Sequence, residues 1–516
     1  MALSRLQCVS LIGLEAVLIE VEVDVATSDK LTLVIVGLPD TAVRESKDRV
    51  LTAVKNSGFT LGSIYSTVNL APGDLKKEGV LYDLPIALGL MRSSGLLKEH
   101  INLTDYLIVG ELSLSGHLRP LAGALAIAML ARAQGKKGVL LPACNADEAA
   151  LVQDIDIYGI ADLQEAAQFV REPAKFTPTK TKIDAFGNAQ EPLVDFSAIK
   201  GQLHAKRSFE IAAAGGHNLI MSGPPGCGKT LMAKALPSIM PPMNIQEALE
   251  VTRIHSIAGL LSEKQTLLTQ RPFRKPHHTI SYAGLIGGGS NPRPGEISLA
   301  HHGILFLDEL PEFSRSVLEV LRQPLEDRKV TISRAHGNFT FPTNIMFVAA
   351  MNPCPCGYLG HPDKACKDSP LQIQRYQNKL SGPLLDRIDI KVDVDSITRY
   401  SDLLQQPPSE SSNKIQQRVI NARQVQHQRF QSSKTNAELS AADLKLHCTL
   451  KSSGWRLLQN AMDAMHFSAR ACDRILRVAR TIADLALYQE IQDEHILESL
   501  GLMNASLTAN QTKSRG

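Results

Sequence analysis

The sequence predicts an α/β protein of three parts: an N-terminal α/β domain, a central domain built on a parallel sheet, and a C-terminal helical domain. Short β-rich runs alternate with helical runs up to about residue 400, which is typical of α/β folds. After a polar break at residues 405–414, the remaining periodic segments are helical. A chain of 516 residues is also too long for one hydrophobic core, so several domains are expected.

The composition is that of a soluble globular chain, with 44% hydrophobic and 21% charged residues. A net charge of +3 argues against a strongly basic nucleic-acid-binding protein but leaves room for a local basic surface. Glu15, Glu20 and Glu22 interrupt the apolar N-terminus, and no run of about 18 uncharged apolar residues occurs. We therefore expect a cytoplasmic protein with no membrane partner.

The first part, residues 1–170, is expected to form one α/β domain. Its first strand alternates with period two, and its first helix ends at Gly58. The expected strands lie in residues 14–26, 30–39, 66–74, 105–116 and 137–143, and the expected helices in residues 40–58 and 81–95. Residues 171–193 are rich in Pro, Thr and Lys without periodicity, which indicates a linker. The further expected parts are a central domain at 194–400, a helical domain at 401–508 and a disordered tail at 509–516.

A phosphate-binding loop is predicted at residues 223–230, which match G-x-x-x-x-G-K-T. The motif follows an apolar strand and opens a helix, so backbone N–H groups and the helix N-terminus would face phosphate oxygens. Lys229 is expected to contact the β- and γ-phosphates of ATP, and Thr230 to bind Mg²⁺. The expected nucleotide-binding residues are Gly223, Pro224, Pro225, Gly226, Cys227, Gly228, Lys229 and Thr230, together with Asp308.

Acidic residues follow a second apolar strand, Ile304 to Leu307. Asp308 is expected to ligate Mg²⁺ through water, and Glu309 to polarise the attacking water. A third strand ends in Asn352, which would orient that water near the γ-phosphate. These spacings predict that the three side chains belong to one hydrolytic site.

Two arginines are candidates for contacting the γ-phosphate in the transition state, because a planar guanidinium matches its spread charge. Arg387 follows a predicted short helix and would act on the nucleotide of a neighbouring subunit. Arg470 lies in the first turn of the strongest predicted helix, which has Ser468 at its N-cap. We expect Arg470 to contact the nucleotide of its own subunit.

Several long segments resemble the magnesium-chelatase-type branch of the AAA+ superfamily, and the whole chain resembles the YifB/ComM family. The segments are GPPGCGKT, KPHHTISYAGLIGGGSNPRPGEISLAHHGILFLDELPEF, LRQPLEDRKVTISRA, FVAAMNPCPCG, SGPLLDRIDI and RILRVARTIADL. The resemblance implies a homohexameric ATPase that uses ATP and Mg²⁺ and acts on single-stranded or branched DNA. It further implies a branch-migration helicase of homologous recombination and natural transformation, with recombination proteins as additional partners.

The N-terminal domain resembles the Lon-protease-like (S5-type) fold, also called ChlI-type, through residues 68–90. In the protease a nucleophilic serine follows a glycine of this segment. Here Gly79 is followed by Val80, Leu81 and Tyr82, none of which can be acylated as a serine is. We therefore expect no peptidase activity from this domain.

The resemblance also implies two pore-facing insertions that would contact DNA. The first holds Arg274, Lys275 and Arg293, and the second is a predicted hairpin with Arg334 and His336 near its turn. Basic loops in a ring pore would follow a phosphate backbone without reading sequence. Without the resemblance, ordinary solvated charges would be the favoured interpretation.

Three cysteines cluster after Asn352, at Cys354, Cys356 and Cys366. Many similar chains have a fourth cysteine where Asp368 stands here. A mixed zinc site with Asp368 or His361 as the fourth ligand is one alternative. The tight C-x-C spacing and the uncertain fourth ligand favour a metal-free loop instead.

Two further functions remain open on the sequence alone. A magnesium chelatase subunit would share the ATPase core but normally lacks the N-terminal domain. An ATP-dependent protein-remodelling factor would fit the Lon-like fold, although the missing serine weakens a protease. Stimulation of ATP hydrolysis by DNA, by a partner chelatase subunit or by unfolded protein distinguishes the three.

Overall fold

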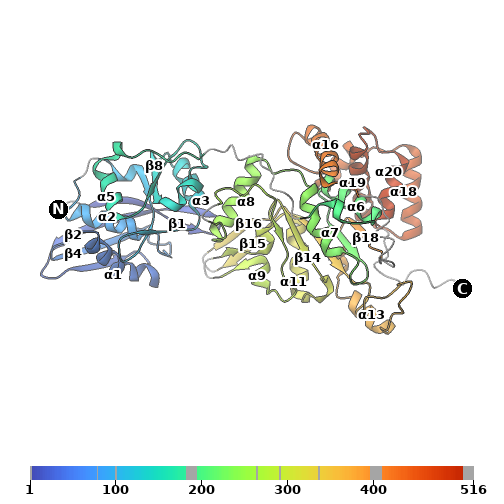
Figure 1. The fold of residues 1–516 in the computed structure, drawn as a ribbon, viewed down its shortest axis with the longest axis horizontal. Coiled ribbons are helices and arrows are strands. Elements are labelled where there is room, and N and C mark those ends of the chain that lie inside the picture. The colour runs from blue at the N-terminus through green and yellow to red at the C-terminus, as the bar shows by residue number, and fades with distance from the viewer. Residues whose placement is uncertain are drawn as a thin grey trace.

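The computed structural model describes residues 3–77, 79–98, 101–181, 194–262, 265–289, 292–334, 337–395 and 409–503. The predicted fold class is confirmed. An N-terminal α/β module, a central module around a parallel sheet and a C-terminal helical module follow one another along the long axis (Figure 1). The expected tail at 509–516 lies outside the described residues. None of the helices in the described ranges is long and apolar enough to cross a membrane.

The N-terminal module is built on a seven-stranded mixed sheet with the order β3-β4-β2-β1-β5-β8-β9. Every second residue of β2 from Ile19 to Val25 is buried, as its alternating sequence predicts. The strands are β1 Ser4–Ile12, β2 Glu15–Thr27, β3 Thr32–Val36, β4 Ile64–Ala71, β5 Tyr106–Ile108, β8 Gly138–Pro142 and β9 Asp156–Ile160, with a small pair β6 Glu111–Leu112 and β7 Leu118–Arg119. The helices are α1 Thr41–Asn56, α2 Asp83–Ser93, α3 Ala124–Ala133, α4 Ala146–Ala149 and α5 Leu163–Arg171.

The first residues of the expected linker pack on this module. Phe176 contacts Phe169 with ring centroids 5.3 Å apart, and the Thr179 N–H donates to the Ile157 carbonyl at 2.8 Å. The chain therefore stays attached to the sheet up to residue 181. Residues 182–193 lie outside the described ranges.

The central module holds a five-stranded parallel sheet with the order β11-β14-β17-β10-β18. Strands β10, β14 and β17 are buried at every position, because helices cover both faces of the sheet. The strands are β10 Leu219–Ser222, β11 Phe273–Arg274, β14 Ile304–Leu307, β17 Met346–Met351 and β18 Ile390–Asp393. The helices are α6 Leu203–Gly215, α7 Lys229–Ala235, α8 Ile245–Ile257, α9 Tyr282–Ile286, α10 Glu296–Leu299, α11 Arg315–Val320, α12 Arg322–Asp327, α13 Pro370–Gln377 and α14 Gly382–Leu385.

Two hairpins project from the central module. One pairs β12 Gly287–Gly288 with β13 Arg293–Pro294, and the other pairs β15 Lys329–Arg334 with β16 Gly337–Pro342. The larger hairpin lies beside the N-terminal module in Figure 1, and Phe339 packs against the turn at Gly13. The hairpins also touch each other, because the Arg334 Nε donates to the Gly289 carbonyl at 3.3 Å.

A polar contact lies at the junction between the N-terminal and central modules. Ser256 on α8 accepts a hydrogen bond from the Gly123 N–H at 2.8 Å and donates to the carboxylate of Glu148. The same carboxylate accepts from the Leu125 N–H at 2.9 Å, in the first turn of α3. Apolar side chains of both modules surround this contact, so the two modules share part of one core.

The C-terminal module packs its helices around α19, which begins as predicted with Ser468 accepting from the Ala471 N–H. Its helices are α16 Ser412–Phe430, α17 Ala441–His447, α18 Ser452–Met465, α19 Ala469–Leu485 and α20 Asp493–Met503. Thr481 on α19 forms a hydrogen bond of 2.8 Å with His217, two residues before β10. This contact fixes α19 at the amino end of the central sheet.

Candidate functional site

The predicted phosphate-binding loop connects β10 to α7. Gly226 and Gly228 have φ of 79° and 92°, a backbone conformation that glycine adopts without strain. The Lys229 ammonium lies inside the loop and donates to the carbonyls of Gly223 at 2.7 Å and Pro224 at 2.8 Å. The concave side of the loop is therefore lined by backbone groups and one lysine, which suits a phosphate chain.

The acidic strand end meets this loop. The Thr230 hydroxyl donates to Asp308 Oδ2 at 2.8 Å, although the two residues are 78 positions apart in sequence. A hydroxyl and a carboxylate oxygen at one point are the hard oxygen donors that Mg²⁺ prefers, so these residues fit the expected metal. Glu309 follows with a left-handed backbone, φ 53°, and an exposed side chain at the end of β14.

Asn352 belongs to the same site. Strand β17 lies between β10 and β14, so its carboxyl end is placed between the phosphate-binding loop and Asp308. Asn352 Oδ1 accepts from the Lys229 ammonium at 3.2 Å. The structure thus brings together the loop, Asp308, Glu309 and Asn352 at the carboxyl edge of the sheet.

Lys275 is a residue of this site that the sequence assigned elsewhere. Its ammonium lies 2.8 Å from Asp308 Oδ2, the oxygen that Thr230 also contacts. The lysine reaches it because β11 is parallel to β14 and ends at the same edge of the sheet. A strand of two residues gives too little sequence signal to predict this position.

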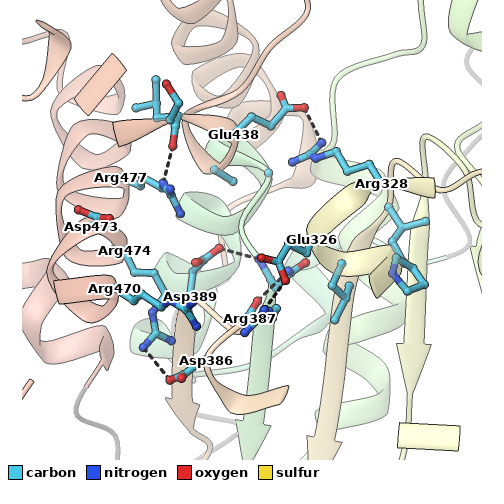
Figure 2. Close-up of a pocket in the computed structure, with 18 of the residues that line it drawn as sticks. Glu326, Arg328, Asp386, Arg387, Asp389, Glu438, Arg470, Asp473, Arg474 and Arg477 are labelled. Carbon is cyan, nitrogen blue, oxygen red and sulfur yellow. Dashed lines mark hydrogen bonds and ion pairs between the residues drawn. The ribbon is translucent and has the colours of Figure 1, made fainter. Parts of the chain in front are cut away.

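A separate cleft of about 560 Å³ lies at the amino ends of β10, β17 and β18. Several arginines and acids line it, contributed by α12, the turn between α14 and β18, the short helix at Asn436–Glu438, and α19 (Figure 2). Arg387 forms an ion pair with Glu326 there and holds the pKa of that carboxyl below its ordinary value. The labelled lining residues in Figure 2 are Glu326, Arg328, Asp386, Arg387, Asp389, Glu438, Arg470, Asp473, Arg474 and Arg477.

Arg470 lines this cleft, which corrects the expectation that it contacts the nucleotide of its own chain. Helix α19 packs at the amino end of β10, whereas the phosphate-binding loop leaves the carboxyl end of the same strand. Four residues of strand separate the two ends by about 13 Å. Arg470 is exposed and has no hydrogen-bond or ion-pair partner among the residues that the structure describes.

The predicted DNA-contacting residues divide into two groups. Arg274 forms two hydrogen bonds of 2.6 and 2.7 Å with Glu296, and Lys275 pairs with Asp308. Both were expected on a projecting loop, but the structure places them against the ATPase core instead. Arg293 and Arg334 are exposed and lie on the two adjoining hairpins. His336 lies outside the described residues.

The cysteine cluster is assembled. The sulfurs of Cys354, Cys356 and Cys366 lie 3.4 to 3.6 Å apart, and Asp368 Oδ2 lies 3.7 Å from Cys366 Sγ. His361, the other candidate ligand, accepts two backbone N–H groups of its own loop instead. The structure therefore places Asp368, and not His361, beside the three thiols.

Comparison with known families covers most of the chain. The family described as "Magnesium chelatase, subunit ChlI" matches residues 195–401. "Subunit ChlI of Mg-chelatase" matches residues 21–145, and "Magnesium chelatase, subunit ChlI C-terminal" matches residues 409–502. The three matches follow the three modules in order.

Individual relatives match over nearly the full length. "Competence protein ComM" of Haemophilus influenzae is 41% identical over 495 residues, which cover 95% of each chain. "Uncharacterized protein YifB" of Escherichia coli K12 is 40% identical over 501 residues, or 97% of each chain. An uncharacterised protein of Mycobacterium tuberculosis H37Rv is 40% identical over 489 residues, covering 94% of this chain and 95% of the relative.

Proposed function

Because this chain belongs to the YifB/ComM family of magnesium-chelatase-like AAA+ ATPases, we propose that it is a ring-forming motor that uses ATP hydrolysis to move DNA. The family implies ATP and Mg²⁺ as cofactors. The more specific proposal is a branch-migration helicase that promotes integration of single-stranded DNA during homologous recombination. The name of the Haemophilus influenzae relative, a competence protein, favours natural transformation as its setting.

One observation supports the assembly of subunits into a ring. The nucleotide-binding residues and the arginine-rich cleft lie at opposite ends of the same strand, β10. Arg387 and Arg470 cannot reach the phosphate-binding loop of their own chain across that distance. They can reach the loop of a second chain if subunits associate head to tail, which is the type of contact from which rings are built. A homohexamer is the number that the family resemblance implies.

The hydrolytic chemistry follows from side chains already in place. Lys229 would exchange its carbonyl partners for phosphate oxygens, and Asn352 would be released to orient water. Glu309 would accept a proton from that water, and its exposed position leaves room for it. Mg²⁺ held at Thr230 and Asp308 would neutralise charge on the phosphates. Arg387 and Arg470 of the neighbouring subunit would stabilise the charge that develops on the γ-phosphate.

The two adjoining hairpins are the proposed DNA-contacting surface. Arg293 and Arg334 are exposed there, while Arg274 and Lys275 are occupied by carboxylates of the ATPase core. Helix α12 lines the cleft, and strand β15 of the larger hairpin follows it directly in the chain. A nucleotide-dependent movement of α12 would therefore move the hairpin. Two arginines per subunit, repeated around a ring, would bind phosphates without reading bases.

The test is ATP hydrolysis with and without single-stranded and forked DNA, at low and high salt. The proposal expects DNA to stimulate hydrolysis, with Lys229→Ala inactive under all conditions. The variant Arg293→Ala/Arg334→Ala should lose most of the ratio of stimulated to basal rate. Arg44→Ala/Lys47→Ala removes the same charge from the exposed face of α1 and is the matched control.

The outcomes separate the candidate functions. Stimulation that the hairpin variant loses and the α1 variant keeps supports a DNA motor and justifies a branch-migration assay on a three-strand substrate. Stimulation by unfolded protein in place of DNA contradicts the proposal and favours a protein-remodelling factor. Active basal hydrolysis that no DNA changes also contradicts it.

A further inference from the structure

The cysteine cluster lies in the loop between β17 and α13 and is separate from the residues that carry hydrolysis. Its four potential ligand atoms, three sulfurs and one carboxylate oxygen, all lie within 4.8 Å of one another. The sulfur separations of 3.4, 3.6 and 3.6 Å exclude a disulfide, whose sulfurs would be about 2.05 Å apart. The three thiols converge on one point without forming a covalent bond.

We propose that Cys354, Cys356, Cys366 and Asp368 bind one structural zinc ion. Zinc–sulfur bonds of about 2.3 Å in a tetrahedron place sulfurs about 3.8 Å apart, close to the observed separations. Three thiolates and one carboxylate complete a four-coordinate shell and leave no open position for a substrate. The set is therefore that of a structural site and not a catalytic one.

The loop conformation supports the fourth ligand. The Cys356 N–H donates to Asp368 Oδ2 at 2.8 Å, which holds the carboxylate against the thiols. His361 Nδ1 accepts from the N–H groups of Asp363 at 3.1 Å and Lys364 at 3.2 Å, so its position is fixed by its own turn. The choice between Asp368 and His361, which the sequence left open, is decided by these contacts.

The ion would stabilise a loop that the nucleotide site depends on. The loop begins directly after Asn352, and Gly357 packs so closely on Pro225 that an added Cβ would lie 2.5 Å from the proline ring. At its other end, Asp368 immediately precedes Ser369, the N-cap of α13. Gln377 at the end of α13 also donates to the Pro353 carbonyl at 3.1 Å. Zinc would thus fasten both ends of the loop and hold it against the phosphate-binding loop.

The first experiment measures metal in the full-length protein, purified without a metal-affinity tag under reducing conditions. Elemental mass spectrometry should find about one zinc per chain, and a thiol-binding mercurial should release it. Replacement of zinc by Co²⁺ should give a thiolate-to-cobalt charge-transfer absorption. Neither measurement requires DNA or ATP, so the result is independent of the proposed function.

The variants assign the ligands. Cys366→Ser and Asp368→Ala should lose most of the zinc, whereas Asp368→Cys should retain it and release it more slowly to a chelator. His361→Ala is the matched control and should bind zinc as the native chain does. Because Asp368→Cys exchanges the carboxylate ligand for a thiolate, it distinguishes ligation from a general loss of folding.

Two results would overturn the site. One is a fully reduced native chain with less than about one-tenth of a zinc ion after growth with added zinc, together with no cobalt absorption. The other is zinc that His361→Ala loses and Asp368→Ala keeps, which would place the ion on a different ligand set.

Discussion

Lys275 gives the nucleotide site a cation of its own, because its ammonium and the Thr230 hydroxyl share Asp308 Oδ2. Mg²⁺ bound near Asp308 would have to displace this ammonium. We therefore predict that Lys275→Met lowers the Mg²⁺ concentration needed for half-maximal ATP hydrolysis by about two- to fivefold, the range expected for a half-exposed ion pair. A Mg²⁺ titration of the hydrolysis rate measures it.

The control for this change is Lys234→Met, which removes an exposed lysine from α7 at some distance from Asp308. A Mg²⁺ requirement that stays the same or increases in Lys275→Met would contradict competition at Asp308. It would indicate that the lysine contacts phosphate once ATP binds.

At the scale of single residues, the sequence predicts the parts of the site that are formed by residues adjacent in the chain. The phosphate-binding loop and the Asp308–Glu309 pair are continuous motifs, and the structure brings them together with Asn352. Lys275 was assigned to DNA because its role depends on a neighbouring strand, β14, thirty residues later in the chain. Arg470 was assigned to its own nucleotide because a sequence does not say at which end of the sheet a helix packs.

At the scale of elements, Glu148 connects α3, α4 and α8 at the junction of two modules. Glu148 is 7% exposed, and burial raises the pKa of its carboxyl above the ordinary value. A raised pKa means that the folded protein binds a proton more tightly than the unfolded chain does. The stability of the junction should therefore decrease as the pH rises from the ordinary pKa of a glutamate through the folded value.

We predict that Glu148→Gln removes this pH dependence, because an amide can accept the same bonds from Leu125 and Ser256 without a charge. Thermal unfolding between about pH 4 and pH 8 should show the variant at least as stable as the native protein at neutral pH. The difference should shrink as the pH falls. A variant that is clearly less stable at neutral pH would show that the ionised form is the one that holds the junction.

The predicted elements largely agree with the structure where pattern alone determines them. Ile304–Leu307 is β14, and Ser468 caps α19 as expected. Strand β1 was not predicted, because its sequence lacks the strict alternation of β2. Its pairing with β2 and β5, which a sequence pattern does not show, is what stabilises it. Strands as short as β11 were not predicted either, since two residues carry no period.

At the scale of the whole molecule, the arginine-rich cleft lies at the opposite end of β10 from the nucleotide site of its own chain. We predict that Arg387→Ala leaves ATP binding nearly unchanged and lowers the maximal hydrolysis rate by about three orders of magnitude, as expected for an arginine acting in trans. Fluorescent-nucleotide binding and steady-state hydrolysis at saturating ATP measure the two effects.

The matched control is Glu326→Gln, which breaks the ion pair with Arg387 but keeps the guanidinium. If the arginine acts on a neighbouring nucleotide, this variant should hydrolyse ATP within a few-fold of the native rate. A loss as large as that of Arg387→Ala would show that the ion pair itself, and not the arginine's reach into another subunit, is required.

The phosphate-binding loop and the cleft arginines lie at opposite ends of β10, and this separation has a genetic consequence. A chain with Lys229→Ala still offers intact arginines, and a chain with Arg387→Ala still offers an intact loop, so two inactive proteins should complement each other. Random co-assembly in equal amounts would pair a good loop with a good arginine at about a quarter of the interfaces. Hydrolysis that returns on mixing after subunit exchange would show that each active site is formed by residues of two neighbouring chains. Mixed assemblies that stay inactive would show that each chain hydrolyses ATP with its own residues alone.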